Sequence, residues 1–188
     1  MRHEDTPAQN LADLANLAAI GMGSNLGNRE ATLLAAWHDL GLQPRIQPLQ
    51  LSSPYLSAPL DMESDHGFIN AVGLIQTSLQ ALDLLHTLQQ LEKRYGRRRD
   101  STASGYQDRT LDLDLLFFAD LCLQTEELTL PHPRLHKRLF VLAPLAELLP
   151  TWRHPLLGGT AATWADKIAR QGEQQVQRQQ WQLCARDA

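Results

Sequence analysis

The stretch DRTLDLDLLFF, residues 108–118, places acidic residues inside a segment with the apolar pattern of a buried strand. Side chains alternate between the two faces of a strand, so the leucines are expected to face one way, and Asp112 and Asp114 the other. The two carboxylates would then lie roughly 7 Å apart on one face, a spacing that suits hard divalent cations. An ordinary amphipathic strand with one wet face is the simpler interpretation of an isolated D-x-D pattern.

The neighbouring residues favour the metal interpretation. Asp114 runs directly into LLFF, which indicates a strand close to the core rather than at the rim. Arg109 stands just upstream, at the end of a loop that already carries arginines at 97–99. Metal-binding acids beside arginines are typical of phosphoryl transfer, because metals neutralise phosphate oxygens and arginines grip them bidentately.

The composition narrows the class of protein. The length of 188 residues is enough for one domain with a substantial core. The contents of 43% hydrophobic and 20% charged residues are ordinary for a globular protein. The formal net charge of -4 gives no bulk attraction to nucleic acid or to anionic membranes. The basic cluster KRYGRRR at 93–99 is too short to favour nucleic-acid binding by itself. We therefore expect neither nucleic acid nor a membrane as a partner.

The cysteines and the apolar runs favour a cytoplasmic location. Cys122 and Cys184 lie far apart, and two free thiols in a reducing compartment are the expected state. No apolar run reaches the roughly 18 residues of a membrane span. The polar start MRHEDTPAQN does not have the pattern of a secretory signal.

The hydrophobic periodicity predicts an α+β sandwich with a mostly antiparallel sheet and helices packed on it. Asn28 and Ser78 are candidate helix N-caps, and Gly41 is a candidate helix end. The Ser-, Gly- and Arg-rich loop at 97–109 is long enough to indicate a function. The predicted strands are 17–22, 46–55, 68–76, 111–118 and 128–130, and the predicted helices are 29–40, 79–95, 137–149 and 161–182.

Several polar residues stand in positions that suit a binding site, although each has a simpler interpretation. Gln89 and Glu92 are three residues apart and share a helix face, which is solvated in most helices. His132 lies between two prolines that hold its imidazole in place, for a phosphate or metal contact or for a purely structural one. Phe68 and Asn70 share a strand face, where the amide could recognise the edge of a planar heterocycle or simply end a strand.

The ordered set GSNLGN, SSPYLSAPL, FINAV, LEKRYGRRR, DRTLDLDLLFF and LTLPHPRLHKRLFVLAPLAEL resembles the 6-hydroxymethyl-7,8-dihydropterin pyrophosphokinase family. The resemblance runs from about Leu17 to Pro150. It implies a ferredoxin-like fold and a Mg²⁺-dependent transfer of the β,γ-pyrophosphoryl group of ATP to a pterin hydroxymethyl group, leaving AMP. It divides the chain into an extension at 1–16, a pyrophosphokinase domain at 17–158 and a helical extension at 159–188.

The same resemblance implies the roles of individual residues. Asp112 and Asp114 would hold two magnesium ions, and together with Arg97 and Arg109 they would form the catalytic set. The positions that line the ATP site are Gln89, Glu92, Arg97, Arg99, Arg109, Thr129, His132 and Arg138. The positions around the pterin are Ser57, Pro59, Leu60, Phe68, Asn70, Tyr106 and Phe140. Either Phe68 or Phe140 could stack on the pterin ring, and a monomer is expected.

Two alternatives stay open at this stage. A divergent paralogue could act on another pterin, and a non-catalytic module could bind a pterin or a nucleotide without turnover. Retention of Asp112, Asp114, Arg97, Arg109 and His132 argues against the module, because binding alone does not require them. One departure is clear: Tyr106, Gln107 and Asp108 stand where the family usually has an aromatic residue, Gly and Pro.

Overall fold

Two long apolar strands, β1 (Asn16–Ser24) and β4 (Phe68–Thr77), form the centre of the sheet. They pair antiparallel along their whole length, from Asn16 opposite Thr77 to Ser24 opposite Ile69. The other strands of this sheet are β2 (Ile46–Leu51), β3 (Tyr55–Ser57), β5 (Asp112–Phe118) and β8 (Val176–Arg178). The strand order is β5-β1-β4-β3-β8, β2 also pairs with β4, and every pairing is antiparallel. The computed structural model describes residues 16–60, 66–96 and 108–182.

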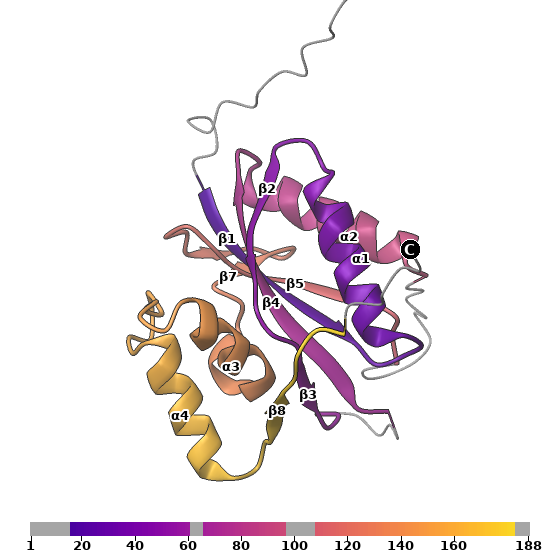
Figure 1. Ribbon diagram of the computed structural model, residues 1–188. Helices are drawn as coiled ribbons and strands as arrows, with labels where there is room; N and C mark the ends of the chain where they lie inside the picture. Colours follow the sequence, from indigo (N-terminus) through magenta and orange to yellow (C-terminus); the bar gives the residue numbers. More distant parts are fainter. Residues whose placement is uncertain (1–15, 61–65, 97–107, 183–188) are drawn as a thin grey trace, which may run out of the picture.

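The helices lie on both faces of this sheet (Figure 1). One face is covered by α1 (Arg29–Gly41) and α2 (Ala81–Arg94), and the other by α3 (Leu139–Leu148) and α4 (Ala161–Gln171). The smaller elements are the hairpin β6 (Leu123–Gln124) and β7 (Thr129–Leu130) and the 3-10 helix η2 (Leu135–Lys137). This arrangement confirms the predicted α+β sandwich with an antiparallel sheet.

The alternation of β1 fills two cores. Ile20 and its neighbours at every second position pack with the α1 and α2 side, whereas Ala19 packs with the α3 and α4 side. Strand β5 follows the same rule, and Leu113 and Leu115 join the first core as predicted. The register between β1 and β5 shifts next to Ile20, so both Leu116 and Phe117 face the second core. This bulge directs two consecutive apolar side chains of β5 into the second core.

The prediction of one continuous strand at 46–55 is wrong, because prolines divide this segment into β2 and β3. Pro48 has no N–H to donate, and the pairing of β2 with β4 shifts register between Pro48 and Gln50. After β2, Ser52 takes over the pairing with β4: its backbone N–H donates to Val72 O at 2.9 Å, and its hydroxyl accepts from Val72 N at 3.0 Å. The chain resumes as β3 only after Pro54.

Two helix ends also differ from the prediction. Asn28 caps α1 as expected, since its side chain accepts from Ala31 N at 3.2 Å. Ser78 does not cap α2: Gln80 occupies that position, and the Ser78 hydroxyl accepts instead from Arg45 Nε at 3.0 Å. The helix predicted from residue 137 begins at Leu139, because the preceding turn is the 3-10 helix η2.

The helix predicted through residue 182 ends at Gln171. Gly172 adopts a left-handed conformation with φ of 75°, which terminates α4 because few other residues take up that geometry without strain. The chain then turns back and adds β8 to the main sheet beside β3 (Figure 1). The predicted domain boundary at residue 158 stays a prediction, but the residues beyond it share the sheet of the central domain.

The indole of Trp37 packs directly against Gly73 of β4, and this contact generates a first prediction. A Cβ added at Gly73 would lie 2.9 Å from Trp37 Cε3 and closer still to Cζ3. The Gly73→Ala variant should therefore be less stable by about 1–3 kcal/mol, which urea unfolding would measure. In a Trp37→Phe background the smaller ring leaves room, so the same substitution should cost less. Equal costs in both backgrounds would show that the overlap is not the cause.

Candidate active site

Asp112 and Asp114 stand on the face of β5 that carries α3 and α4, opposite two glycines of β1. Gly23 pairs with Asp112 and Gly21 with Asp114. A Cβ added at Gly23 would lie 3.3 Å from Asn70 Oδ1 and 3.8 Å from Asp112 Cβ. The missing side chain therefore keeps space open beside Asp112, and sequence reasoning overlooked this role of the GMGSN segment.

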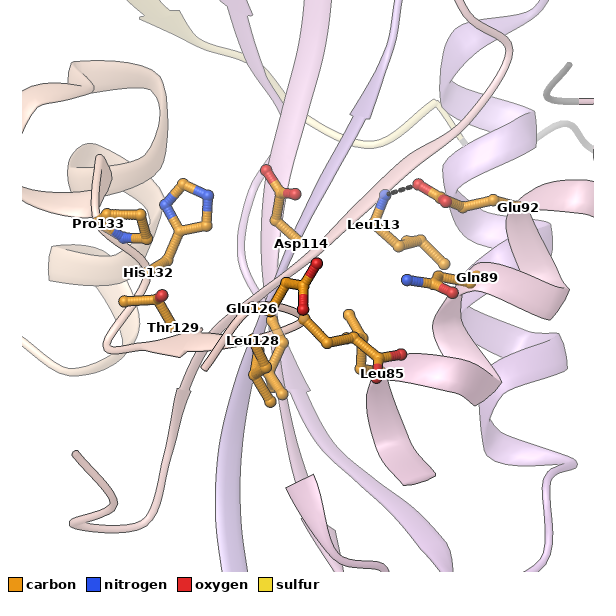
Figure 2. Close-up of a pocket in the computed structure, with 12 residues that line it drawn as sticks. Leu85, Gln89, Glu92, Leu113, Asp114, Glu126, Leu128, Thr129, His132 and Pro133 are labelled. Atoms are coloured by element: carbon orange, nitrogen blue, oxygen red, sulfur yellow. Dashed lines mark hydrogen bonds between the residues drawn. The ribbon is translucent and has the colours of Figure 1, made fainter. Parts of the chain in front are cut away.

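The first pocket opens on the Asp114 side and has a volume of about 260 Å³ (Figure 2). Gln89 and Glu92 project into it from α2 on one side, Thr129 and His132 approach from the opposite side, and Asp114 stands between them. Gln89, Glu92, Thr129 and His132 are four of the eight positions that the resemblance assigned to the ATP site, and Asp114 is one of the two that it assigned to metal. Glu126 and Glu127 also line this pocket and were not predicted.

The second pocket lies on the Asp112 side and is narrow, with a volume of about 40 Å³. It is walled by two aromatic rings, two arginines and an amide. Its lining residues are Gly23, Ser57, Leu60, Phe68, Asn70, Arg109, Asp112, Arg138 and Phe140. Five of the seven positions expected around the pterin thus come together here. Of the other two, Pro59 lies half-buried on the segment between Ser57 and Leu60, and Tyr106 is outside the described residues.

The predicted ATP residues are divided between the two pockets. Arg109 and Arg138 line the second pocket, next to the residues expected around the pterin, rather than the first. Arg97 and Arg99 lie outside the described residues. The two aspartates therefore lie between the two pockets, and both arginines line the pocket on the Asp112 side.

Each aspartate is paired with one of these arginines, and each arginine also covers a ring. Arg109 Nη1 lies 3.3 Å from Asp112 Oδ1, and its guanidinium stands 5.9 Å from the centre of the Phe68 ring. Arg138 Nη1 lies 3.8 Å from Asp114 Oδ2, and its guanidinium stands 5.5 Å from the centre of the Phe140 ring. The carboxylates are thus balanced by positive charge while their side chains stay 20% and 37% exposed.

Glu92 is not the solvated residue that helical spacing suggested. It is 2% exposed, and its Oε1 accepts a 2.8 Å hydrogen bond from Leu113 N between the two aspartates (Figure 2). A buried carboxylate that accepts a backbone N–H supports the strand directly, because β5 lies at the edge of the sheet. His132 N donates similarly to Leu116 O at 2.8 Å.

His132 is held as a neutral imidazole. Burial, together with the positive charges of Arg138 and Arg134, lowers its pKa from 6.5 to about 4, although Asp112 opposes the shift. Its Nδ1 accepts from Arg134 N at 3.2 Å, so the neutral ring carries its proton on Nε2. This places an uncharged N–H donor in the first pocket.

Asn25 fixes the backbone that leads into β5, and sequence reasoning missed it. Its side-chain amide donates to Asp108 Oδ1 at 2.5 Å and its Oδ1 accepts from Arg109 N at 2.7 Å, while its backbone N–H donates to Arg109 O at 3.2 Å. Asp108, which departs from the proline usual in the family, thus makes a defined contact. The GSN turn alone could not reveal this role of Asn25, because Asp108 lies 83 residues further along the chain.

In the second pocket, Asn70 is buried and oriented by a neighbour. Its Nδ2 donates to Ser57 Oγ at 3.0 Å, and the two residues are 5% and 7% exposed. A buried amide held in this way keeps a fixed direction and presents a fixed hydrogen-bonding edge.

The donor set suits a cation that brings other ligands with it. In the described part of the chain, no group of three His, Cys, Asp or Glu side chains forms a ready-made metal centre. Magnesium is commonly held by one or two carboxylates plus substrate phosphates and water. Asp112 and Asp114, beside the space left by Gly23, match that requirement. No helix among the described residues is long and apolar enough to span a bilayer.

Proteins of known sequence resemble the chain over most of its length. Residues 19–150 match the model of the family described as 7,8-dihydro-6-hydroxymethylpterin-pyrophosphokinase (HPPK). The 2-amino-4-hydroxy-6-hydroxymethyldihydropteridine pyrophosphokinase of Bacillus subtilis is 41% identical over 133 residues, covering 71% of this chain and 78% of that protein. The Porphyromonas gingivalis protein of the same name is 40% identical over 138 residues, covering 72% of this chain and 92% of that protein.

Solved structures resemble the fold. An HPPK-DHPS chain, crystallised in complex with substrates, superimposes with a TM-score of 0.69 at 12% identity. The match covers 84% of this chain and 44% of that chain, so this chain spans less than half of that larger protein. The likeness confirms the ferredoxin-like arrangement that the family resemblance implied.

The lowered pKa of His132 generates a second prediction. Between about pH 6.5 and 4 the unfolded chain binds a proton at this histidine and the folded protein does not, so stability falls as pH falls through that range. Replacing His132 with Gln should make the free energy of unfolding less dependent on pH there, by up to ~1.4 kcal/mol per pH unit.

Urea unfolding at several pH values would measure this slope. The control is Leu42→Gln just after α1, a position that is 66% exposed and carries no titratable group, so a wild-type slope is expected. Superimposable slopes for wild type and His132→Gln would mean that His132 is not held neutral.

Proposed function

Because the chain belongs to the HPPK family, we propose that it transfers pyrophosphate from ATP to 6-hydroxymethyl-7,8-dihydropterin in folate biosynthesis, giving the pterin diphosphate and AMP. The observation that carries this proposal to individual residues is the position of Asp112 and Asp114. They stand side by side on one strand face, with a polar pocket on one side and an aromatic pocket on the other. A transfer between two bound substrates requires such a shared boundary.

The first pocket is proposed to bind ATP through Gln89, Glu92, Thr129 and His132. Its lining includes four carboxylates, from Glu92, Asp114, Glu126 and Glu127, which would repel a bare triphosphate. The nucleotide would therefore have to bind together with cations. Two Mg²⁺ held by Asp112 and Asp114 would neutralise phosphate oxygens and lower the pKa of the pterin hydroxyl.

The second pocket is proposed to bind the pterin. Asn70, fixed by Ser57, would recognise the edge of the ring, and Phe68 and Phe140 would contact its faces. At about 40 Å³ the pocket is too narrow for a bicyclic ring, so entry requires side chains to move. The guanidiniums of Arg109 and Arg138 already lie over the two rings and are the planar groups that a pterin would displace there.

The chain contributes mainly positioning and charge. Arg109 would move from Asp112 to grip the transferred phosphates once cations balance the carboxylate. His132 would donate its Nε2 proton in a hydrogen bond to a phosphate oxygen without bringing a further charge. Asp112 or Asp114 would accept the hydroxyl proton at most transiently.

Several expectations rest on the resemblance alone. Arg97 and Arg99 at the ATP site, and Pro59 and Tyr106 at the pterin site, stay predictions. A cytoplasmic monomer also stays a prediction. A paralogue acting on another pterin would show itself by preferring polyhydroxypropyl-pterins, and a non-catalytic module by binding Mg·ATP without forming AMP.

The third prediction tests the metal-binding pair. Asp114→Asn keeps the shape of the side chain and removes its charge, so AMP formation should fall on the order of 10²–10³-fold. Chromatographic detection of AMP after mixing protein, Mg·ATP and hydroxymethyl-dihydropterin would measure it. The matched control is Asp120→Asn in the exposed turn after β5, which should retain wild-type turnover. An active Asp114→Asn variant would refute the proposed metal role.

The fourth prediction separates phosphate contact from pterin contact. Arg109→Ala should lower kcat far more than it raises the dissociation constant of the pterin, because the guanidinium acts on developing phosphate charge. Arg109→Lys should recover only part of kcat, since a single ammonium cannot replace the bidentate fork. Single-turnover kinetics and pterin titration would measure the two effects. A selective loss of pterin affinity would instead show that the Arg109 guanidinium acts on the pterin and not on the phosphates.

A further inference from the structure

The segment after α4, residues 173–182, folds back onto the central domain although it lies beyond the family match (Figure 1). Val176 in β8 pairs with Ser57 in β3, and Ser57 is the residue that orients Asn70. Trp181 Nε1 donates to Ser52 O at 2.9 Å. The segment therefore lies beside β3, whose Ser57 lines the second pocket.

Gln174 makes the contact that matters most for the site. Its side-chain Nε2 donates to Lys137 O at 2.9 Å, and its Oε1 accepts from Leu139 N at 2.8 Å. These two backbone groups belong to the peptide units on either side of Arg138. One glutamine amide thus pairs with Arg138 as a neighbouring strand would, while Arg138 holds an extended conformation with φ of -116° and ψ of 108°.

The backbone that Gln174 holds carries two residues of the second pocket. These two residues are Arg138 and Phe140. Arg138 is 8% exposed, its Nη1 lies 3.8 Å from Asp114 Oδ2, and its guanidinium lies over the Phe140 ring. A small rotation of the backbone at Arg138 is amplified along its long side chain. Leu139 begins α3, so the same hydrogen bond also satisfies an N–H at the start of that helix.

We propose that Gln174 is a positioning residue for the pyrophosphoryl transfer, acting through Arg138. The inference rests on the proposed function and adds a segment outside the matched residues to its machinery. The amide is required because it offers a donor and an acceptor at once. A carboxylate at this position would lose the donor and face the Lys137 carbonyl with a second acceptor.

The test compares Gln174→Met, which keeps the length but removes both hydrogen bonds, with Gln175→Met at the exposed neighbouring position. We expect kcat/KM for AMP formation to fall on the order of 10-fold in Gln174→Met, because misplacement of a contact group slows the reaction. Gln175→Met should match wild type. Gln174→Glu serves as a second variant if the methionine variant does not fold, and it should also lose activity.

A double-mutant cycle with Arg138→Ala separates positioning from general stability. In that background the side chain to be positioned is gone, so Gln174→Met should change kcat/KM by less than about twofold. The shift in Tm caused by Gln174→Met should be the same in both backgrounds, since the hydrogen bonds it removes are to backbone.

The outcomes are distinguishable. Equal loss of kcat/KM in both backgrounds, or no loss in Gln174→Met, would overturn the positioning role and leave the proposed function intact. A wild-type protein that forms no AMP would overturn the proposed function and the positioning role with it.

Discussion

The antiparallel register between β1 and β5 is the constraint on which the site depends. A shift of one residue would turn Asp112 and Asp114 under α1 and α2 and expose Leu113, because side chains alternate strictly along a strand. Burying two unpaired carboxylates costs far more than exposing a leucine, so the charges themselves help to fix the register. The native register sets each aspartate beside a glycine of β1 and leaves room for ligands.

Charge balance then determines how the rest of the site is arranged. Two carboxylates on neighbouring same-face positions repel one another, and Arg109 and Arg138 reduce that repulsion in the structure. The same arginines are the groups that a phosphate would attract. Cations arriving with a nucleotide would take over the balancing of the carboxylates and free the guanidiniums for phosphate. Binding of the nucleotide with its cations and release of the two arginines from the carboxylates would thus occur together.

Sequence reasoning found what depends on local pattern and missed what depends on distant pairing. The alternation in residues 111–118 predicted which side Asp112 and Asp114 face, and the apolar spacing predicted α1 and α2. The segment at 161–182 was predicted as one helix, yet Gly172 ends α4, and the residues that follow pair with β3 as β8. Asn25 and Gln174 could not be found, because their roles exist only through partners far away in sequence.

Strand β5 combines two demands that usually conflict. It lies at the edge of its sheet, where unpaired backbone groups invite association with other chains, and it must also stay accessible to substrates. Two residues of the first pocket meet both demands. The Glu92 carboxylate accepts a hydrogen bond from Leu113 N, and the backbone N–H of His132 donates one to Leu116 O. Because these groups close the edge and line the pocket together, a substitution at Glu92 disturbs the strand that carries the aspartates as well as the nucleotide contact. Loss of activity at Glu92 alone therefore does not identify it as a ligand, whereas an effect on turnover without loss of stability would.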